Sequence, residues 1–325
     1  MAGARIYVWL TVFALIAVYF LVIFTRNRKR GAMKKKTWEP YLFILPSILV
    51  LFALYGYPLI DSFAMAFQNF KLSQPKKIYF NGFDNFTKLF KDPDIGMIIG
   101  SSLTYVVVSL LGQFLLGLTL AMALRKKFRG RNAYQSLVFL PWAFSAFVVG
   151  LMFRWSFNGE YGVVNDMLLK LGIITERIAW LGDPNYSLWV VIFAMIWVGI
   201  PFFAIMLLAA LQSIPKDIYE SADIDGSGSV NRFFRITLPY IKPTIIMTLL
   251  LRTIWIFNSF DLIVIITGGG PANSSQTLPS YMYSRAFSSY DFGLASALGV
   301  VLILILSLYA IFFLRVTNYS KAGDF

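Results

Sequence analysis

One charged residue lies inside a long apolar run. Arg252 is near the middle of the stretch 245–266, three residues before Trp255. An ionisable side chain in such a run needs a partner or water, and it is a candidate for function. A guanidinium can form two parallel hydrogen bonds with a carboxylate or a phosphate. We therefore expect Arg252 to bind an anionic group. The alternative is that it pairs internally, for example with Asp261 or with a residue of another subunit.

A polar segment, 212–243, separates two apolar runs and has the pattern of a short helix. We expect Ser213 to cap this helix and Gly226 to end it. Glu220 and Asp223 are one turn apart and would form an acidic edge. Three apolar residues would share another face: Ile214, Ile218 and Ala222. An ordered pattern of this kind predicts docking onto a partner. The alternative is a solvated helical hairpin without one.

Several kinds of chemistry are excluded by what the sequence lacks. The chain has no Cys and no His, which rules out disulfides and thiolate metal sites and removes the commonest general base. We therefore expect no catalytic triad and no metal cluster. The glycine-rich lysine motif that cradles ATP phosphates is also missing, so this chain is not expected to bind ATP itself.

The composition is that of an integral membrane protein. Hydrophobic residues make up 58% of the 325 residues and charged residues only 14%, which is too little polar surface to cover a soluble globule of this size. The net charge of +13 comes from Lys and Arg that cluster beside apolar runs. This arrangement indicates membrane topology and a lipid bilayer as the surroundings, and we expect no nucleic-acid partner.

Seven apolar stretches are long enough to cross a bilayer as helices, because unpaired backbone cannot lie in lipid. They are 6–25, 41–63, 97–124, 134–157, 188–211, 244–267 and 292–314. The predicted fold class is an all-α membrane protein. We expect a first domain, 1–36, consisting of an extra transmembrane helix and a basic linker, and a main transmembrane domain, 37–325. The polar segments 64–96 and 158–187 are large enough for short helices of their own.

Lys and Arg predict the orientation of these spans. Seven lie in 26–36 and five in 125–131, and 212–242 and the C-terminal tail add more on the same side. The side richer in Lys and Arg is expected to be cytoplasmic. This places the N-terminus outside, the C-terminus in the cytoplasm and the segment 212–243 on the cytoplasmic face.

Three motifs resemble those of a known family. Glu220, Ala222 and Gly226 are followed after nine residues by Ile-x-Leu-Pro at 236–239, in register with the EAA loop of ABC importer permeases; Ser221 replaces the middle alanine. The stretches 257–261 and 267–271 resemble the fifth-helix signature of the carbohydrate permeases of maltose and glycerol-phosphate type. The stretch 197–202 resembles their fourth core helix. The resemblance covers roughly residues 40–318.

This resemblance implies a type I importer core of six helices, to which 6–25 adds an extra N-terminal helix. It implies a coupling helix that seats on a dimeric ABC ATPase through Glu220, Ser221, Ala222, Asp223 and Gly226, so that ATP-driven closure of the ATPase produces alternating access. It also implies substrate contacts from Val198, Gly199, Phe202, Arg252, Trp255 and Asn258. One polar sugar ligand of the pattern is Met195 here, which indicates a substrate other than maltose. Together with Arg252, this suggests an acidic sugar, such as a uronic-acid oligosaccharide of alginate type.

The partners implied are a second homologous permease chain, the ATPase, an extracytoplasmic solute-binding protein and a sugar substrate. ATP and Mg would bind to the ATPase, and no cofactor is expected in this chain. The location implied is the bacterial cytoplasmic (inner) membrane. Two other classes stay open from the sequence: a stand-alone secondary transporter of a small solute, for which few buried carboxylates are present, and an intramembrane enzyme that uses carboxylates.

Overall fold

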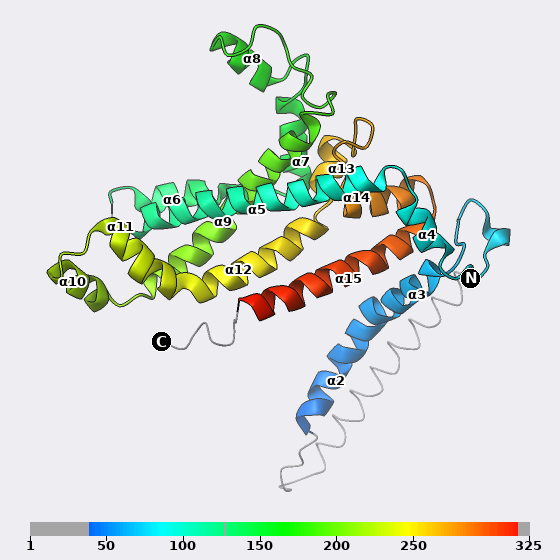
Figure 1. Ribbon diagram of the computed structural model, residues 1–325, viewed down its shortest axis with the longest axis horizontal. Coiled ribbons are helices and arrows are strands. Elements are labelled where there is room, and N and C mark those ends of the chain that lie inside the picture. The colour runs from blue at the N-terminus through cyan, green and yellow to red at the C-terminus, as the bar shows by residue number, and fades with distance from the viewer. Residues whose placement is uncertain (1–38, 127, 318–325) are drawn as a thin grey trace, which may run out of the picture. The chain divides into compact units, whose positions relative to one another are not determined.

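The computed structural model describes residues 39–126 and 128–317, which are helical with short connections (Figure 1). The predicted helix 6–25 and its basic linker lie outside the described residues. The described chain divides between Met65 and Ala66 into two compact units. Among the described residues, five helical stretches are long and apolar enough to cross a membrane, and a bent helix pair is a sixth candidate. These six correspond to the six core spans expected from the sequence.

The described part of the first unit, from residue 39 onward, is a single apolar helical stretch. It consists of α2 (Glu39–Leu51), the π-helical turn η1 (Phe52–Gly56) and most of α3 (Tyr57–Ala66). The candidate span is Phe43–Ala66. Pro58 lies two residues after the π-helical turn, and a proline has no N–H to donate to the preceding turn. The local change of hydrogen-bond pattern is a common way for a helix to accommodate such a residue.

The second unit is built around α5 (Ile95–Arg125), α9 (Ser187–Gln212), α12 (Leu238–Asn258) and α15 (Phe292–Val316) (Figure 1). Glycines let α5 and α9 approach closely, as small residues do in membrane helix pairs. A Cβ at Gly117 would lie 2.4 Å from the Cβ of Phe203, and one at Gly112 would lie 2.6 Å from the Cδ1 of Ile196. The α5–α9 pair is therefore the tightly packed centre of this unit.

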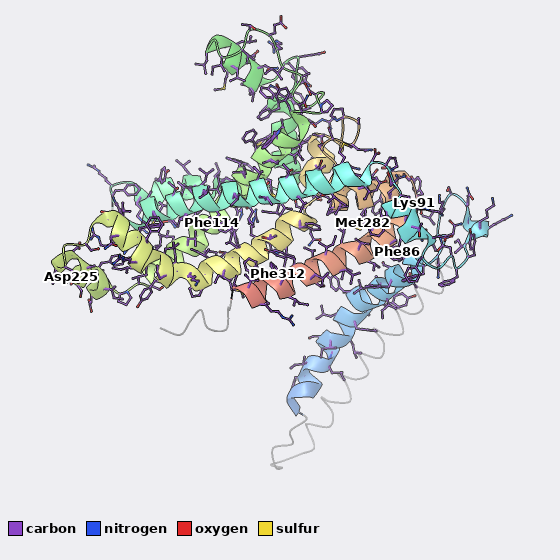
Figure 2. All side chains as sticks on the ribbon, viewed as in Figure 1. Phe86, Lys91, Phe114, Asp225, Met282 and Phe312 are labelled. Atoms are coloured by element: carbon purple, nitrogen blue, oxygen red, sulfur yellow. The ribbon has the colours of Figure 1, made fainter. Side chains whose placement is uncertain are left out.

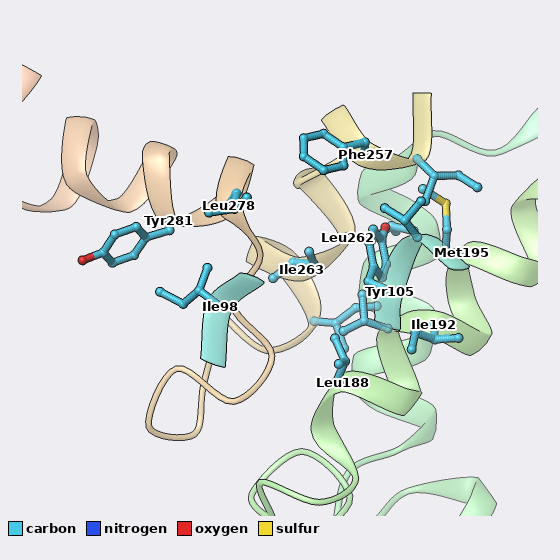
Figure 3. Close-up of a cluster of buried hydrophobic side chains, with 14 of the residues drawn as sticks. Ile98, Tyr105, Leu188, Ile192, Met195, Phe257, Leu262, Ile263, Leu278 and Tyr281 are labelled. Atoms are coloured by element: carbon cyan, nitrogen blue, oxygen red, sulfur yellow. The ribbon is translucent and has the colours of Figure 1, made fainter. Parts of the chain in front are cut away.

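Two clusters of buried apolar side chains form its core. One of them includes Tyr105 of α5 with Ile192 and Met195 of α9, and residues of the 257–281 region close around it (Figure 3). The other lies toward the end of α5 and includes Leu124, Phe203 and Ile214. Both clusters join helices that are far apart in the sequence.

The span expected at 134–157 is broken, which corrects the prediction of one continuous helix. The chain forms α6 (Arg131–Phe139), the 3-10 turn η3 (Leu140–Ala143) and α7 (Ala146–Ser156), and the two arms meet at 94°. Pro141 cannot donate a backbone hydrogen bond, and Ser145 begins a new helix by accepting the N–H of Val148 at 3.3 Å.

The span expected at 244–267 also has an interruption. Helix α12 is preceded by α11 (Ser229–Arg232) and the π-helical turn η4 (Phe233–Thr237), and together with α13 (Asp261–Ile266) they form the candidate span Ser229–Ile266. Ser259 and Phe260 leave the helix, since Ser259 is in an extended conformation. The apolar composition predicts the stretch but not the break.

The connections expected to hold short helices do so. They contain η2 (Pro75–Lys77), α4 (Asp84–Phe90) and α8 (Val163–Lys170). Asn165 of α8 is fully buried and organises its segment. Its carboxamide donates to the carbonyls of Gly159 and Ile178 and accepts from the indole N–H of Trp180 at 2.8 Å.

A polar cluster ties the start of α5 to α14 (Leu278–Tyr283) and the π-helical turn η5 (Ser284–Ser288). Asp92 accepts hydrogen bonds from the hydroxyl of Tyr281 and, at 3.1 Å, from Nη2 of Arg285. Burial raises the pKa of Asp92, but the hydrogen bonds from Tyr281 and from the N–H of Asp94, together with the charge of Arg285, outweigh it. The pKa of Asp92 is therefore lowered below its usual value, and the cluster holds a carboxylate.

Candidate functional site

The structure buries Arg252 and gives it a neutral partner. The residue is on α12 and is 7% exposed, and its Nε donates to Oε1 of Gln113 on α5 at 2.7 Å. The Nε2 of Gln113 donates in turn to the backbone carbonyl of Met195 on α9 at 2.8 Å. Within the described residues no carboxylate forms an ion pair with Arg252, so the pairing with Asp261 weighed from the sequence is not found. Three helices meet through this chain of hydrogen bonds.

Gln113 is a site residue that the sequence reasoning missed. It lies 139 positions before Arg252, and no local motif links the two. The signal that could have found it is the one that found Arg252: a polar side chain in the interior of an apolar span.

Two aromatic rings accompany the guanidinium. The Cζ of Arg252 lies 5.5 Å from the centroid of the Phe202 ring and 5.9 Å from that of Trp255, within the range of cation–π contacts. The two rings are themselves 5.5 Å apart. Phe202 is buried, whereas Trp255 is 54% exposed. The guanidinium thus lies beside an aromatic surface that is open on its Trp255 side.

The other three predicted contact residues have different surroundings. A Cβ on Gly199 would lie 2.0 Å from Cδ of Gln113, so the glycine provides the space that the Gln113 side chain occupies. Val198 is half-buried and packs against the apolar cluster of Figure 3. Asn258 is exposed and its amide donates to the carbonyl of Ile254 in its own helix at 2.9 Å. Phe202 and Trp255 therefore lie beside Arg252, and Gly199 lies beside Gln113. Val198 and Asn258 make other contacts.

The segment 212–243 contains the expected short helix, α10 (Lys216–Ile224). Its cap differs from the prediction. Ser213 ends α9, with its hydroxyl donating to the carbonyl of Ala210 at 2.8 Å, and Pro215 occupies the N-cap position. The cause is the proline, whose fixed φ suits a helix start and whose missing N–H needs no cap.

Gly226 ends α10 as expected. Its φ is +69°, a left-handed conformation that favours glycine. The N–H of Ser227 bonds to the carbonyl of Ala222 at 2.9 Å and the N–H of Gly226 to that of Asp223 at 3.1 Å. This pair of bonds is the Schellman motif. Asp225, labelled in Figure 2, is the residue between the end of α10 and Gly226.

The predicted faces of α10 are confirmed. Ile214 and Ala222 are buried and Ile218 is half-buried, which turns this side toward the protein. Glu220 and Ser221 are exposed. Asp223 is exposed as well, but it forms an ion pair with Arg232 of α11. Its carboxylate therefore has a partner within the same loop. Of the two acidic residues expected along this edge, only Glu220 has no ion-pair partner among the described residues.

Helix α10 is tied to both helices that hold the Gln113–Arg252 pair. The ring of Tyr219 lies under the guanidinium of Arg125, the last residue of α5, with 4.1 Å between Cζ and the ring centroid. The hydroxyl of Tyr219 hydrogen-bonds with Thr237, which precedes α12, at 2.8 Å. A displacement of α10 would therefore act on α5 and α12 together.

The same loop also carries exposed apolar side chains. Ile224 is 88% exposed, Val230 72% and Phe234 60%. They follow one another along the end of α10, α11 and η4. Exposed apolar side chains of a loop are candidates for contact with a partner.

The chain matches known proteins over most of its length. The profile of the family described as "Binding-protein-dependent transport system inner membrane component" matches residues 113–319. The sulfoquinovosyl glycerol transport system permease protein SmoG of Agrobacterium fabrum is 36% identical over 261 residues, which are 80% of this chain and 84% of that protein. The trehalose/maltose transport system permease protein MalF of Thermococcus litoralis is 31% identical over 283 residues, which are 86% of this chain and 94% of that protein.

A solved structure is similar as well. A chain in the crystal structure of a bacterial ABC transporter involved in the import of the acidic polysaccharide alginate superposes with a TM-score of 0.76 and 29% sequence identity. The match covers 86% of this chain and 95% of that chain. With a family profile that spans more than half of its residues and with relatives of this similarity, the chain belongs to the family of binding-protein-dependent transport system inner membrane components, the permease subunits of ABC transporters.

Proposed function

We propose that this chain is a permease subunit of an ATP-driven importer for a sugar or oligosaccharide that carries acidic groups, such as a uronic-acid oligosaccharide of alginate type. The names of its relatives support a carbohydrate: they include transporters of sulfoquinovosyl glycerol, trehalose/maltose and diacetylchitobiose. The alginate importer, whose substrate is described as acidic, is similar over most of the chain.

The proposal that the substrate carries acidic groups rests on the environment of Arg252. Its guanidinium is buried beside Phe202 and Trp255 and has a neutral hydrogen-bond partner. An arginine without a carboxylate partner in a low-dielectric interior favours an anionic ligand. Aromatic rings next to it suit the apolar faces of sugar rings. A uronic acid offers both features in one residue of a saccharide.

The coupling role of α10 rests on the exposed surface of its loop. Glu220, Ser221 and the apolar Ile224 face outward, whereas Ala222 packs inward and Gly226 makes the turn. We assign this surface to a groove on a separate dimeric ATPase, which binds ATP and Mg. Because Asp223 is paired with Arg232, its contribution is to stiffen the loop, and the apolar side chains take most of the contact.

Transport would then follow alternating access. Closure of the ATPase dimer moves α10, and Tyr219 passes that movement to the ends of α5 and α12. A second, homologous permease chain would complete the pathway, and an extracytoplasmic solute-binding protein would deliver the sugar. In this arrangement the chain lies in the bacterial cytoplasmic membrane with 212–243 and the C-terminus in the cytoplasm. Membership of the ABC permease family argues against a stand-alone secondary transporter and against an intramembrane enzyme.

The test is substrate-stimulated ATP hydrolysis by the complete complex in proteoliposomes, with alginate oligosaccharides as the acidic probe and maltotriose as the neutral one. Arg252→Ala should reduce the response to the acidic probe by about tenfold or more, since a hydrogen bond to a charged group contributes about 1.5–3 kcal/mol. Arg154→Ala is the matched control, because Arg154 is an intraspan arginine that is bonded to the carbonyl of Ile265. An equal loss for both saccharides in Arg252→Ala would refute the acidic substrate.

A further inference from the structure

Both the oxygen and the nitrogen of the Gln113 carboxamide form hydrogen bonds. The residue is fully buried in the middle of α5, its carbonyl oxygen accepts from Nε of Arg252, and its amide donates to the carbonyl of Met195. The position of the carboxamide is thereby set by α9, and the carboxamide in turn sets the position of the guanidinium on α12. Gly199 is part of this arrangement, because a Cβ there would collide with Gln113.

A glutamine in this place has a particular electrostatic consequence. It satisfies one donor of the guanidinium and leaves the positive charge uncompensated. A glutamate of the same length would also accept from Nε, but it would neutralise the charge. Among the described residues Nη1 and Nη2 of Arg252 have no hydrogen-bond partner. These two nitrogens form the side of the guanidinium that can hold a carboxylate through two bonds.

We propose that Gln113 is a specificity-determining positioning residue: it fixes the guanidinium of Arg252 through Nε and keeps its charge available for one acidic group of the transported solute. This inference rests on the proposed function, and it adds that the preference for an acidic over a neutral saccharide is set by the uncharged partner on α5. Gln113 itself touches no substrate in this scheme. It acts only through Arg252.

The test uses the complete complex with alginate oligosaccharides and maltotriose, and the quantity measured is the ratio of acidic to neutral stimulation. This ratio does not depend on how much complex folds, so a purely structural role would leave it unchanged. Gln113→Glu should lower it by about tenfold or more, because the carboxylate neutralises Arg252. Gln113→Met keeps the volume but removes the bond to Nε, and it should lower the ratio through loss of the acidic response alone.

Ser109→Ala is the matched control. Ser109 is fully buried one turn before Gln113, and its hydroxyl has no hydrogen-bond partner among the described residues. Its removal should leave the ratio unchanged.

The outcomes separate the two proposals. If the wild-type complex prefers the acidic probe and Arg252→Ala abolishes that preference, but both Gln113 variants keep it, the role of Gln113 is refuted and the proposed function stands. If the wild type shows no acidic preference, or Arg252→Ala retains it, the acidic substrate is refuted and the role of Gln113 with it.

Discussion

The packing of α5 against α9 makes Gly117 the most sensitive glycine of the bundle. The Cβ of an alanine at this position would lie 2.4 Å from the Cβ of Phe203, 3.1 Å from the backbone nitrogen of Ala204 and 3.2 Å from the carbonyl oxygen of Ile200. Carbon atoms in contact are normally about 3.5–4.0 Å apart. All three neighbours belong to the α9 backbone or are attached to it directly, so no flexible side chain can give way. In Gly117→Ala the two helices must separate locally by about 1 Å.

The cost of this separation can be worked out from the same region. Overpacking of a core costs about 1–3 kcal/mol. The bond from Gln113 to the carbonyl of Met195 is 2.8 Å long and crosses the same interface one turn away, so a shift of about 1 Å would break it. A hydrogen bond between membrane helices contributes about 0.6 kcal/mol on average. The sum is about 1.6–3.6 kcal/mol, or a melting temperature lower by roughly 3–14 °C.

The assay is thermal unfolding of the detergent-purified chain, followed by tryptophan fluorescence. Gly100→Ala is the control, since it lies on the same helix and a Cβ there meets no atom within 4 Å. This control should be neutral or slightly stabilising, because alanine favours a helix over glycine. If Gly117→Ala melts at the wild-type temperature, or if Gly100→Ala is equally destabilised, the close approach of α5 and α9 does not limit the size of the side chain at position 117.

Three further changes have defined outcomes. Gly199→Ala should destabilise the chain, because the added Cβ displaces the side chain of Gln113. Adding Gln113→Ala should recover part of the lost stability in the same melting assay. If the effects of the two substitutions are purely additive, the steric cause is wrong. Ile224→Ser should leave the melting temperature unchanged but reduce co-purification of the ATPase, because this apolar side chain is 88% exposed. Full retention of the ATPase would argue against a contact between Ile224 and the ATPase. Asp92→Asn should lower the melting temperature at neutral pH. Because the pKa of Asp92 is lowered in the folded chain, the stabilisation that its carboxylate contributes is complete above the unfolded-state pKa of about 3.9 and is lost as the pH falls through the folded-state pKa. The difference in melting temperature between Asp92→Asn and the wild type should therefore shrink below about pH 4. A difference that does not depend on pH would contradict this reasoning.

The amino-acid sequence by itself determined the class of this protein and the approximate positions of six candidate spans among the described residues, but not the breaks within two of them. A bilayer requires about 20 apolar residues with every backbone group paired, and this requirement can be read from composition alone. The helix α10 and its end at Gly226 were equally accessible, since a short helix with one apolar face and a left-handed glycine is a local pattern. For the same reason the family could be predicted from its short motifs alone.

Only the tertiary structure decided which side chains meet. Gln113 and Arg252 belong to different helices, and only the close approach of α5 and α9 brings the glutamine, through its bond to Met195, to the guanidinium. Because these helices approach closely, the absence of a side chain at Gly199 leaves the space that Gln113 occupies. The folding of the loop places Asp223 in an ion pair with Arg232. The physical reason is that lipid constrains each helix separately, whereas the pairing of buried polar groups depends on how distant helices pack.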